Sequence, residues 1–302
     1  MIAECGHTIV IVLGMPHLSF GGLSEQWVLK ECGHIHWNLL ASSQGLTRPN
    51  FRDVHGRRLY AVFIEVRLVD GALTGAIEDA ELTIRSELSR ESVGRYLSRH
   101  VLSCNSQNIC KITMRSAFVR RKNTGCNLSV ERGFTIAEPG QSNASRRQVA
   151  PIDRQFPAQK RFAFTPCIYS DFNGADFLYF ASYQSITDRA EACFFGPIIG
   201  TTRAREIHYY GNINPGDGIY IDLLTFKQVT DTLVYSATMC RQSDAVRIAA
   251  ITVEKRILCY LMPSRLPVEL DSTAEPKCSQ DGKADSVLHG CGDAEAIAIG
   301  LA

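Results

Sequence analysis

The fold of this chain is indicated by two similar stretches of sequence. Residues 20–41 read FGGLSEQWVLKECGHIHWNLLA, and residues 167–189 read CIYSDFNGADFLYFASYQSITDR. Each stretch combines a glycine-containing turn with a long run in which apolar residues recur among polar ones at helical spacing. We therefore predict two long, largely buried helices, the first over Phe20–Ala41 and the second within Cys167–Arg189.

The two stretches also align with each other. At a separation of 152 residues, Ser19–Gly22 matches Asp171–Gly174. A second correspondence joins the regions that follow, because the strand pattern that begins at Glu81 matches the one that begins at Gly218, 137 residues later. The repetition indicates that one unit has been duplicated, with a shorter connection between helix and sheet in the second copy.

Each unit places one long helix before several strands that are joined by Gly, Asn or Ser turns, with residues 57–68 and 258–264 among the predicted strands. A single long helix buries its apolar stripe by lying across one face of an antiparallel sheet. The predicted fold class is therefore α+β, a double hot-dog made of two tandem hot-dog units with their sheets edge to edge. A pair of generic α+β domains that do not share a sheet is the alternative.

Three regions of the chain are predicted. Residues 1–150 form the first hot-dog unit, residues 151–264 form the second, and residues 265–302 form a poorly ordered C-terminal tail. The linker between the units is placed at 131–159, which is rich in Gly, Ser, Asn, Arg and Pro and lacks apolar periodicity. The tail is predicted from its Ser, Asp, Ala, Gly and Lys content.

The composition excludes several classes of protein. A chain of 302 residues with 45% hydrophobic and 21% charged residues is typical of globular proteins. A net charge of +1 gives no overall field for a nucleic-acid backbone, so nucleic acid is not an expected partner. The eleven cysteines are spread without a CxxC pair, which fits reduced thiols, and the apolar run Thr8–Leu13 is too short to span a bilayer. We expect a cytoplasmic protein without a membrane partner.

The glycine turn at Phe20–Ser24 is the first candidate site. The chain has no GxSxG elbow, Walker loop, GxGxxG or HExxH motif. A helix that opens with glycine leaves the N–H groups of its first turn accessible to a ligand, and such groups stabilise an oxyanion. We assign this role to Gly22 and Leu23, helped by Ser24 or Ser19. An ordinary helix cap that needs glycine is the alternative.

Tyr60 is the second candidate, at the start of an apolar strand with Arg57 and Arg58 just before it. A phenol with a pKa near 10 is a poor nucleophile at neutral pH unless a cation or a hydrogen-bond donor stabilises the phenolate, but it is a good proton donor. The alternatives are a packing role for the tyrosine, and for the arginines either solvated charges or contacts to the phosphates of a nucleotide-bearing thioester.

A metal site is considered and not predicted. Cys32 and His36 stand four residues apart on one helical face, but no second cluster of ligands accompanies them. The basic run Arg120–Lys122 is interpreted as a solvated turn, with an acidic carrier protein as the alternative contact.

Three stretches carry a resemblance to a known family: GMPHLSFGGLSEQWVLKECGHIHW at 14–37, RRLYAVF at 57–63 and SDFNGADFLYFASY at 170–183. They resemble the family of the bifunctional acyltransferase/decarboxylase of leinamycin biosynthesis, found in polyketide and nonribosomal peptide clusters, over about residues 10–262. The resemblance implies a double hot-dog enzyme that decarboxylates methylmalonyl-CoA to a propionyl thioester. It also implies transfer of that acyl group to the phosphopantetheine arm of an acyl carrier protein.

In that family a tyrosine is implicated as the acyl acceptor, and Tyr60 is the matching position. The turn Gly21–Ser24 also matches the family motif. No cofactor is expected, since the CoA thioester is the substrate, and a homodimer is left open. The predicted substrate-binding residues are His17, Ser19, Phe20, Gly21, Trp27, Arg57, Arg58 and Asn173.

Two other functions are kept as alternatives. A hot-dog thioesterase or dehydratase that acts on carrier-bound acyl chains needs a carboxylate or a His–carboxylate pair, which Asp171 or Asp176 could supply. The other is a binding module that docks a carrier protein without chemistry.

Overall fold

The structure is a computed structural model, and it describes residues 5–122, 126–128, 130–132, 158–196 and 198–260. Residues 1–262 form one compact unit, to which all the described residues belong. The predicted boundary at residue 150, most of the linker and the whole C-terminal tail lie outside the described residues. None of the described helices is both long and apolar enough to cross a membrane.

The first half of the described chain contains one long helix, α1 (Glu25–Ser43), and two short 3₁₀ helices, η1 (Met15–His17) and η2 (Leu73–Gly75). Its strands are β1 (Cys5–Val12), β2 (Leu18–Ser19), β3 (Gly22–Leu23), β4 (Tyr60–Val69), β5 (Glu81–Ser92), β6 (Arg95–Cys104), β7 (Gln107–Arg121) and β8 (Val130–Arg132).

The second half repeats this plan with one helix and a run of strands. The helix is α2 (Phe180–Phe195). The strands are β9 (Lys160–Phe164), β10 (Ile198–Tyr209), β11 (Ile219–Val229), β12 (Thr232–Arg241) and β13 (Arg247–Tyr260).

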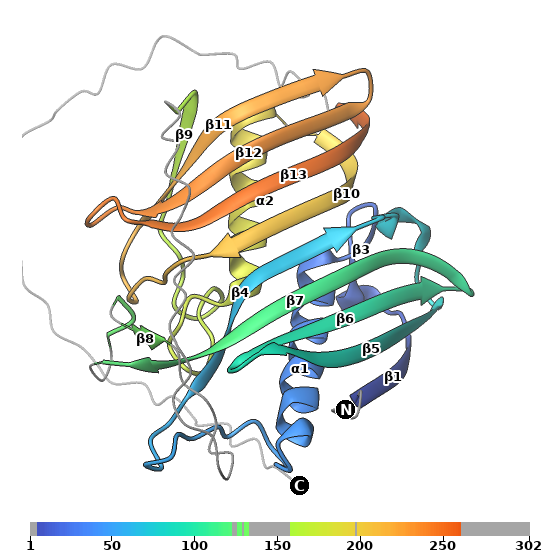
Figure 1. Cartoon of the computed structure of the whole chain (residues 1–302). Helices are drawn as coiled ribbons and strands as arrows, with labels where there is room; N and C mark the ends of the chain where they lie inside the picture. The colour runs from blue at the N-terminus through green and yellow to red at the C-terminus, as the bar shows by residue number, and fades with distance from the viewer. Residues whose placement is uncertain (1–4, 123–125, 129, 133–157, 197, 261–302) are drawn as a thin grey trace, which may run out of the picture. The chain divides into compact units, whose positions relative to one another are not determined.

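Strands from both halves join in one antiparallel sheet of 11 strands (Figure 1). The order is β1-β5-β6-β7-β4-β10-β13-β12-β11-β9, with β8 paired to β7, and β2 and β3 form a separate hairpin. Strands β4 and β10 make the junction between the halves through four pairs, from Glu65↔His208 to Leu68↔Arg205. Both long helices lie behind this sheet in the view of Figure 1.

The helices bury the apolar residues that gave rise to the prediction. On α1, Val28, Leu29 and Cys32 are fully buried in the core. The two helices approach each other closely at Gly33, where a Cβ atom would lie 2.6 Å from the ring of Phe180. A larger residue at this position of α1 would push against the start of α2.

The first helix starts later than predicted. Gly21 and Gly22 have φ values of +89° and +129°, which are not helical, and they belong to the β2–β3 hairpin. The helix begins at Glu25, after Ser24, whose side-chain oxygen accepts a hydrogen bond from the N–H of Trp27. The prediction that Gly22 and Leu23 contribute free N–H groups from the first helical turn is therefore wrong, because serine and not glycine caps this helix.

The second helix also starts later than its sequence stretch. The residues before it form turns and a bridge between Phe172 and Leu178, and α2 begins at Phe180. The strand predicted at 57–68 begins at Tyr60, and of the strand predicted at 258–264 only the part up to Tyr260 is described. The eight cysteines of the described chain from Cys32 to Cys259 are all free.

Candidate functional site

A cavity opens where strands β4 and β10 separate. These strands pair only from Glu65 to Leu68 of β4, although β4 begins at Tyr60 and β10 continues to Tyr209. Before Glu65 of β4 and after His208 of β10 the two strands no longer pair, and we call the opening between Tyr60–Ile64 and Tyr209–Asn212 the fork. All residues of these two segments line the cavity, which has a volume of about 270 Å³.

The rest of the lining is mostly aromatic and aliphatic and comes from both halves of the chain. We call the whole cavity, including the two segments that form the fork, the Tyr60 cavity. Its further lining residues are Trp37, Pro49, Phe51, Arg58, Leu59, Val119, Asn127, Val130, Asn173, Ala175, Phe177, Leu178, Phe180 and Tyr183.

Tyr60 is surrounded by two cations and one aromatic ring. The guanidinium carbon of Arg58 lies 5.3 Å from the centre of its ring, and that of Arg121 lies 5.2 Å away. The ring of Phe177 meets it edge-on at 5.2 Å. Neither arginine forms an ion pair with an acid among the described residues, so both positive charges act on the surroundings of the phenol.

The hydroxyl of Tyr60 has no hydrogen-bond partner in the described part of the chain. The deeper tyrosines differ, because Tyr183 donates to the carbonyl of Gly211 at 2.9 Å and Tyr209 donates to that of Phe180 at 3.2 Å. Burial raises the pKa of both Tyr183 and Tyr209. Tyr60 and Tyr210 are both half-buried, and of these two only Tyr60 lies between two guanidinium groups.

The described lining contains no Ser, Thr, Cys, His, Lys, Asp or Glu residue. Its polar side chains are tyrosines, asparagines, one tryptophan and Arg58, and Arg121 reaches the same region by donating to the carbonyl of Ala175. Asp171 and Asp176, the predicted carboxylates of the hydrolase alternative, are not among the described lining residues. The carboxylate of Asp171 instead accepts a hydrogen bond from the N–H of Cys167 at 2.8 Å.

Two asparagines of the lining, Asn173 and Asn212, shape the cavity wall. The side-chain oxygen of Asn173 accepts hydrogen bonds from the N–H groups of Ala175 and Phe177, at 2.9 and 3.2 Å, and so fixes the turn before α2. Asn212 exchanges two hydrogen bonds with the backbone of Leu178, which ties this turn to the end of β10. The amide nitrogen of Asn173 has no partner among the described residues, and the role of Asn173 in binding substrate stays a prediction.

The structure brings Tyr60, Arg58 and Asn173 together on this cavity but places Arg57 elsewhere. The guanidinium of Arg57 pairs with Asp53 at 2.8 Å and does not line the cavity. Asp53 also binds Arg120 at 3.1 Å, so two residues of the predicted basic segments are neutralised by one buried acid.

The remaining predicted site residues gather at the β2–β3 hairpin and the start of α1. Ser19 pairs with Gly22, and the N–H of Ser24 donates to the carbonyl of His17 at 2.9 Å. A Cβ atom at Gly22 would lie 2.3 Å from the carbonyl oxygen of Leu73, so glycine is needed here for contact with η2. This packing contact within the chain explains why position 22 is a glycine.

Phe20 and Trp27 were predicted to bind substrate. Phe20 is 83% exposed. Trp27 packs edge-on against the ring of His17, with 4.7 Å between ring centres. Neither these two residues, nor His17, Ser19 and Gly21–Ser24, are among the lining residues of the Tyr60 cavity.

A buried ion pair that the sequence analysis missed closes the start of α1. Glu25, the first residue of the helix, lies 2.7 Å from Arg205 on β10 and accepts a hydrogen bond from Thr202 at 2.8 Å. Arg205 also binds Asp188 of α2 at 2.6 Å. Burial raises the pKa of Glu25, against the effect of the nearby arginine. Since the partners lie 180 residues apart in the sequence, no local pattern could have shown them.

His36 belongs to a buried chain of hydrogen bonds and not to a metal site. Its Nδ1 atom is 2.7 Å from the hydroxyl of Ser98, and its Nε2 atom is 2.8 Å from that of Ser116. The chain continues from Ser98 through His100 to Ser86, at 2.8 and 2.7 Å. Burial lowers the pKa of both histidines to about 3. Both nitrogens of His36 are therefore occupied, which argues against a shared metal with Cys32.

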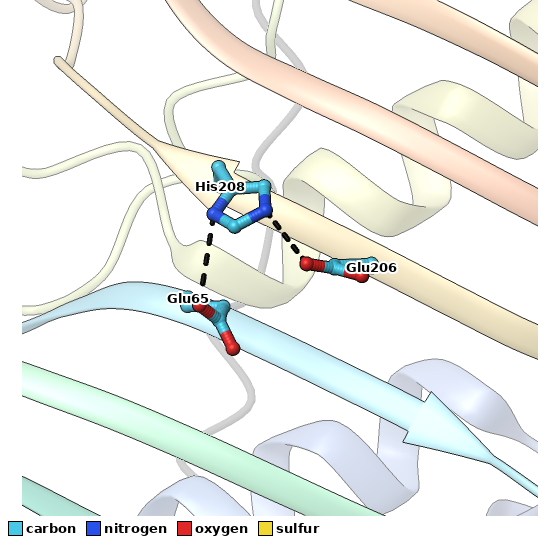
Figure 2. A group of neighbouring side chains, drawn as sticks. All are labelled: Glu65, Glu206 and His208. Carbon is cyan, nitrogen blue, oxygen red and sulfur yellow. Dashed lines mark ion pairs between the residues drawn. The ribbon is translucent and has the colours of Figure 1, made fainter. Parts of the chain in front are cut away.

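One group of side chains in the described residues has a spacing that could hold a metal ion: Glu65, Glu206 and His208 on β4 and β10 (Figure 2). His208 lies 2.7 Å from Glu206 and 3.7 Å from Glu65. Glu206 also pairs with Arg67, and Glu65 also pairs with Arg115. A metal ion would have to compete with these two cations. We interpret the group as a set of ion pairs that holds β4 and β10 together beside the fork.

Comparison with known proteins gives similarity of structure only. No family model and no curated protein sequence matches the chain. The solved structures similar to it include the 12:0-ACP thioesterase of Umbellularia californica, with a TM-score of 0.62 at 8% identity, covering 84% of this chain and 98% of that one.

Two bacterial structures are similar to a comparable extent. A putative oleoyl thioesterase from Lactobacillus plantarum has a TM-score of 0.57 at 12% identity and covers 84% of this chain and 96% of its own. An acyl-ACP thioesterase from Bacteroides thetaiotaomicron has a TM-score of 0.54 at 14% identity and covers 83% and 98%. At these identities the likeness concerns the fold alone, and it shows that this chain has a hot-dog fold.

Proposed function

We propose that this protein is an acyl-thioester-processing enzyme in which Tyr60 accepts the acyl group. The observation that carries the proposal is a phenol without a hydrogen-bond partner in the described residues, flanked by two guanidinium groups on an apolar cavity. The fold supports the thioester part, because the similar solved structures include enzymes named as thioesterases. The duplicated sequence pattern further supports an interpretation of the two halves as tandem hot-dog units.

The side chains of the cavity lining limit which group can act as the nucleophile. Serine, cysteine, histidine and carboxylates are the usual groups for acyl transfer or hydrolysis, and the described lining has none of them. Of the other cavity tyrosines, Tyr183 and Tyr209 donate to backbone carbonyls and are held protonated by burial. Tyr210 has one guanidinium near its ring, that of Arg247 at 5.3 Å, whereas Tyr60 has two. Tyr60 therefore has the strongest case as the acyl acceptor.

The two arginines place positive charge beside the phenol of Tyr60, and a phenol without such charge is a weak nucleophile. A guanidinium near the ring stabilises the phenolate relative to the neutral phenol. In the proposed step the Tyr60 oxygen attacks the thioester carbonyl carbon, the C–S bond breaks, and the phenol proton passes to the departing sulfur, so that CoA leaves as a thiol. The thiol of a carrier's phosphopantetheine arm then attacks the tyrosyl ester, and its proton returns to the tyrosine oxygen.

The same cavity is suited to decarboxylation of a malonyl-type acyl group such as methylmalonyl. That reaction needs no general base, since the electrons of the C–C bond move into the thioester to give an enolate while CO₂ leaves. It needs hydrogen-bond donors or cations near the enolate oxygen and apolar surroundings for the carboxylate. Arg58, Arg121 and the amide of Asn173 could supply the first, and the aromatic walls supply the second.

A hot-dog thioesterase or dehydratase is the second candidate, and the named activities of the similar structures favour it. In the described chain, however, neither Asp171 nor Asp176 lies on the Tyr60 cavity. Hydrolysis would then require water to attack the tyrosyl ester without a neighbouring carboxylate. A docking module without chemistry is the third candidate.

One experiment separates these functions. The protein is mixed with methylmalonyl-CoA, malonyl-CoA and unbranched acyl-CoA, with and without an acyl carrier protein in its phosphopantetheine form, and all masses are followed. The proposal predicts an acyl-protein adduct and transfer to the carrier, with loss of 44 Da where decarboxylation occurs. Free acid and CoA without any adduct would support the hydrolase instead, and unchanged CoA esters would contradict both enzymes.

A further inference from the structure

The strand that carries Tyr60 is supported on only one side at this position. Tyr60 pairs with Val119 of β7, but the pairing of β4 with β10 begins only at Glu65. The segment Tyr60–Ile64 is therefore the edge of the sheet within the fork. A one-sided strand segment opens more readily than a central one, so the position of the phenol depends on other contacts.

Trp37 of α1 supplies such a contact next to the phenol. Its indole N–H donates to the carbonyl of Ala61 at 3.0 Å. Its ring also lies against those of Phe63 and Phe180, with centres 5.3 and 5.8 Å apart. The indole thus makes one hydrogen bond to the strand within the fork, where β10 makes none, and it does so one residue after Tyr60.

The turn of α1 that carries Trp37 is itself held rigidly. The preceding residue, His36, is fully buried, and its ring is bound by Ser98 of β6 and Ser116 of β7 at 2.7 and 2.8 Å. Two adjacent residues of the helix therefore reach three strands, His36 to β6 and β7 and Trp37 to β4. A buried and fully satisfied polar network of this kind fixes relative positions.

We propose that Trp37 is a positioning residue for Tyr60, and that its N–H fixes the edge of β4 so that the phenol stands correctly in the cavity. This inference rests on the proposed function of Tyr60 and adds a group that does not itself meet the acyl carbon. Displacement of a reacting group by about 1 Å can slow a reaction about a hundredfold, so a single hydrogen bond to the neighbouring peptide is sufficient to matter.

The test removes the N–H and keeps an aromatic ring. Trp37→Phe is compared with the parent and with Asn38→Ala, a control on the exposed side of the same helical turn. We expect formation of the acyl-protein adduct to be at least about tenfold slower in Trp37→Phe, with the acyl-CoA concentration at half-maximal rate changed less than about threefold. Asn38→Ala should behave as the parent.

A second readout does not depend on activity. Amide hydrogen exchange in a peptide that covers residues 59–64 should be faster in Trp37→Phe, while peptides from β6 are unchanged. If Trp37→Phe does not fold, replacement of Trp37 by 3-benzothienylalanine removes the N–H at nearly constant shape and takes its place. An unchanged adduct rate, or unchanged exchange at 59–64, would overturn the proposal.

The two proposals fail in different ways. If the parent protein forms no adduct with any acyl-CoA, the function proposed for Tyr60 is lost. The exchange measurement then still decides whether Trp37 holds the edge of β4. If the parent forms the adduct and Trp37→Phe forms it equally fast, only the positioning role is lost.

Discussion

The starts of the two long helices differ in what fills the space beside them. At the start of α1, Glu25 lies 2.7 Å from Arg205 of β10, and the hairpin before it packs on η2. At the start of α2, the corresponding space is the Tyr60 cavity, with Phe177 and Phe180 in its wall. Two similar sequence stretches have thus produced one closed start and one open start.

The difference shows how two halves with the same plan of helix and strands can differ in the space beside their helix starts. The helix and strands are repeated because they bury apolar surface in the same way. The side chains that enter the space beside each helix start come from the other half of the chain, namely Arg205 in one case and Tyr60 in the other. Those residues decide which start is open.

The largest expected effect comes from breaking the closed start. Glu25→Ala leaves Arg205 buried with only Asp188 as an acidic partner, and removal of one member of a buried ion pair costs about 3 to 5 kcal/mol. Urea unfolding should show a loss of this size. Replacing both Glu25 and Arg205 by methionine should cost much less. A loss below about 1 kcal/mol for Glu25→Ala would mean that the pair does not hold this start closed.

Lowering the pH should reduce the stability of the fold, because the first half contains two buried histidines. His36 and His100 are neutral in the fold with a pKa of about 3, whereas in the unfolded chain they titrate near 6.5. The unfolded state binds more protons between these values, so stability is complete above about pH 6.5 and falls as the pH decreases towards 3. At pH 5.5 the two histidines together should cost about 3 kcal/mol of stability, shared about equally between them.

This acid effect can be assigned by mutation. Urea unfolding at pH 7.5 and pH 5.5 is compared for the parent and for a variant with His100→Phe, which removes one of the two titrating groups. The variant is expected to lose about half of the pH dependence, whatever its stability at pH 7.5. An unchanged pH dependence would show that other groups cause it.

A smaller loss of stability is expected to distinguish Gly22 from Gly174, the two glycines that align in the sequence. Gly22→Ala places a Cβ atom 2.3 Å from the carbonyl oxygen of Leu73 at a φ of +129°, whereas Gly174 has nothing within 4 Å of that atom. Thermal or urea unfolding should show a loss of about 2 kcal/mol for Gly22→Ala and less than about 1 kcal/mol for Gly174→Ala. Equal losses would remove this difference between the two starts.

The smallest effect concerns the cation beside the phenol. Arg121→Gln removes a guanidinium 5.2 Å from the ring of Tyr60, and we expect acyl-adduct formation to slow by about tenfold, a barrier change of about 1.4 kcal/mol. Arg67→Gln on the same strand as Tyr60 is the matched control, since Arg67 faces Glu206. If both variants react equally fast, the arginine beside Tyr60 does not stabilise the phenolate.

The sequence predicted the repeated plan of helix and strands because that plan depends on local periodicity. It failed at the helix starts, where Gly21 and Gly22 looked like a helix opening. In the structure Ser24 caps α1 and the two glycines form the hairpin before it. A serine followed by an acidic residue was the available signal for this boundary.

The candidate site could be predicted only in part. Tyr60, Arg58 and Asn173 were named from the sequence, and the structure brings these three together on one cavity. The pairing of Glu25 with Arg205 and the contact of Arg121 with Tyr60 join residues far apart in the chain, so no spacing rule could reveal them. The fork that forms the cavity depends on where β4 and β10 stop pairing, which a single sequence does not show.

We expect the open start beside Tyr60 to react with an acyl thioester and the closed start at Gly22–Glu25 not to react. To test this, the protein is incubated with an acyl-CoA and digested, and the acyl group is located by tandem mass spectrometry, with Tyr60→Phe in parallel. We expect one modified peptide, which carries the acyl group on Tyr60, and no modification in the variant. An acyl group on Ser19 or Ser24, or an undiminished adduct in Tyr60→Phe, would contradict this expectation.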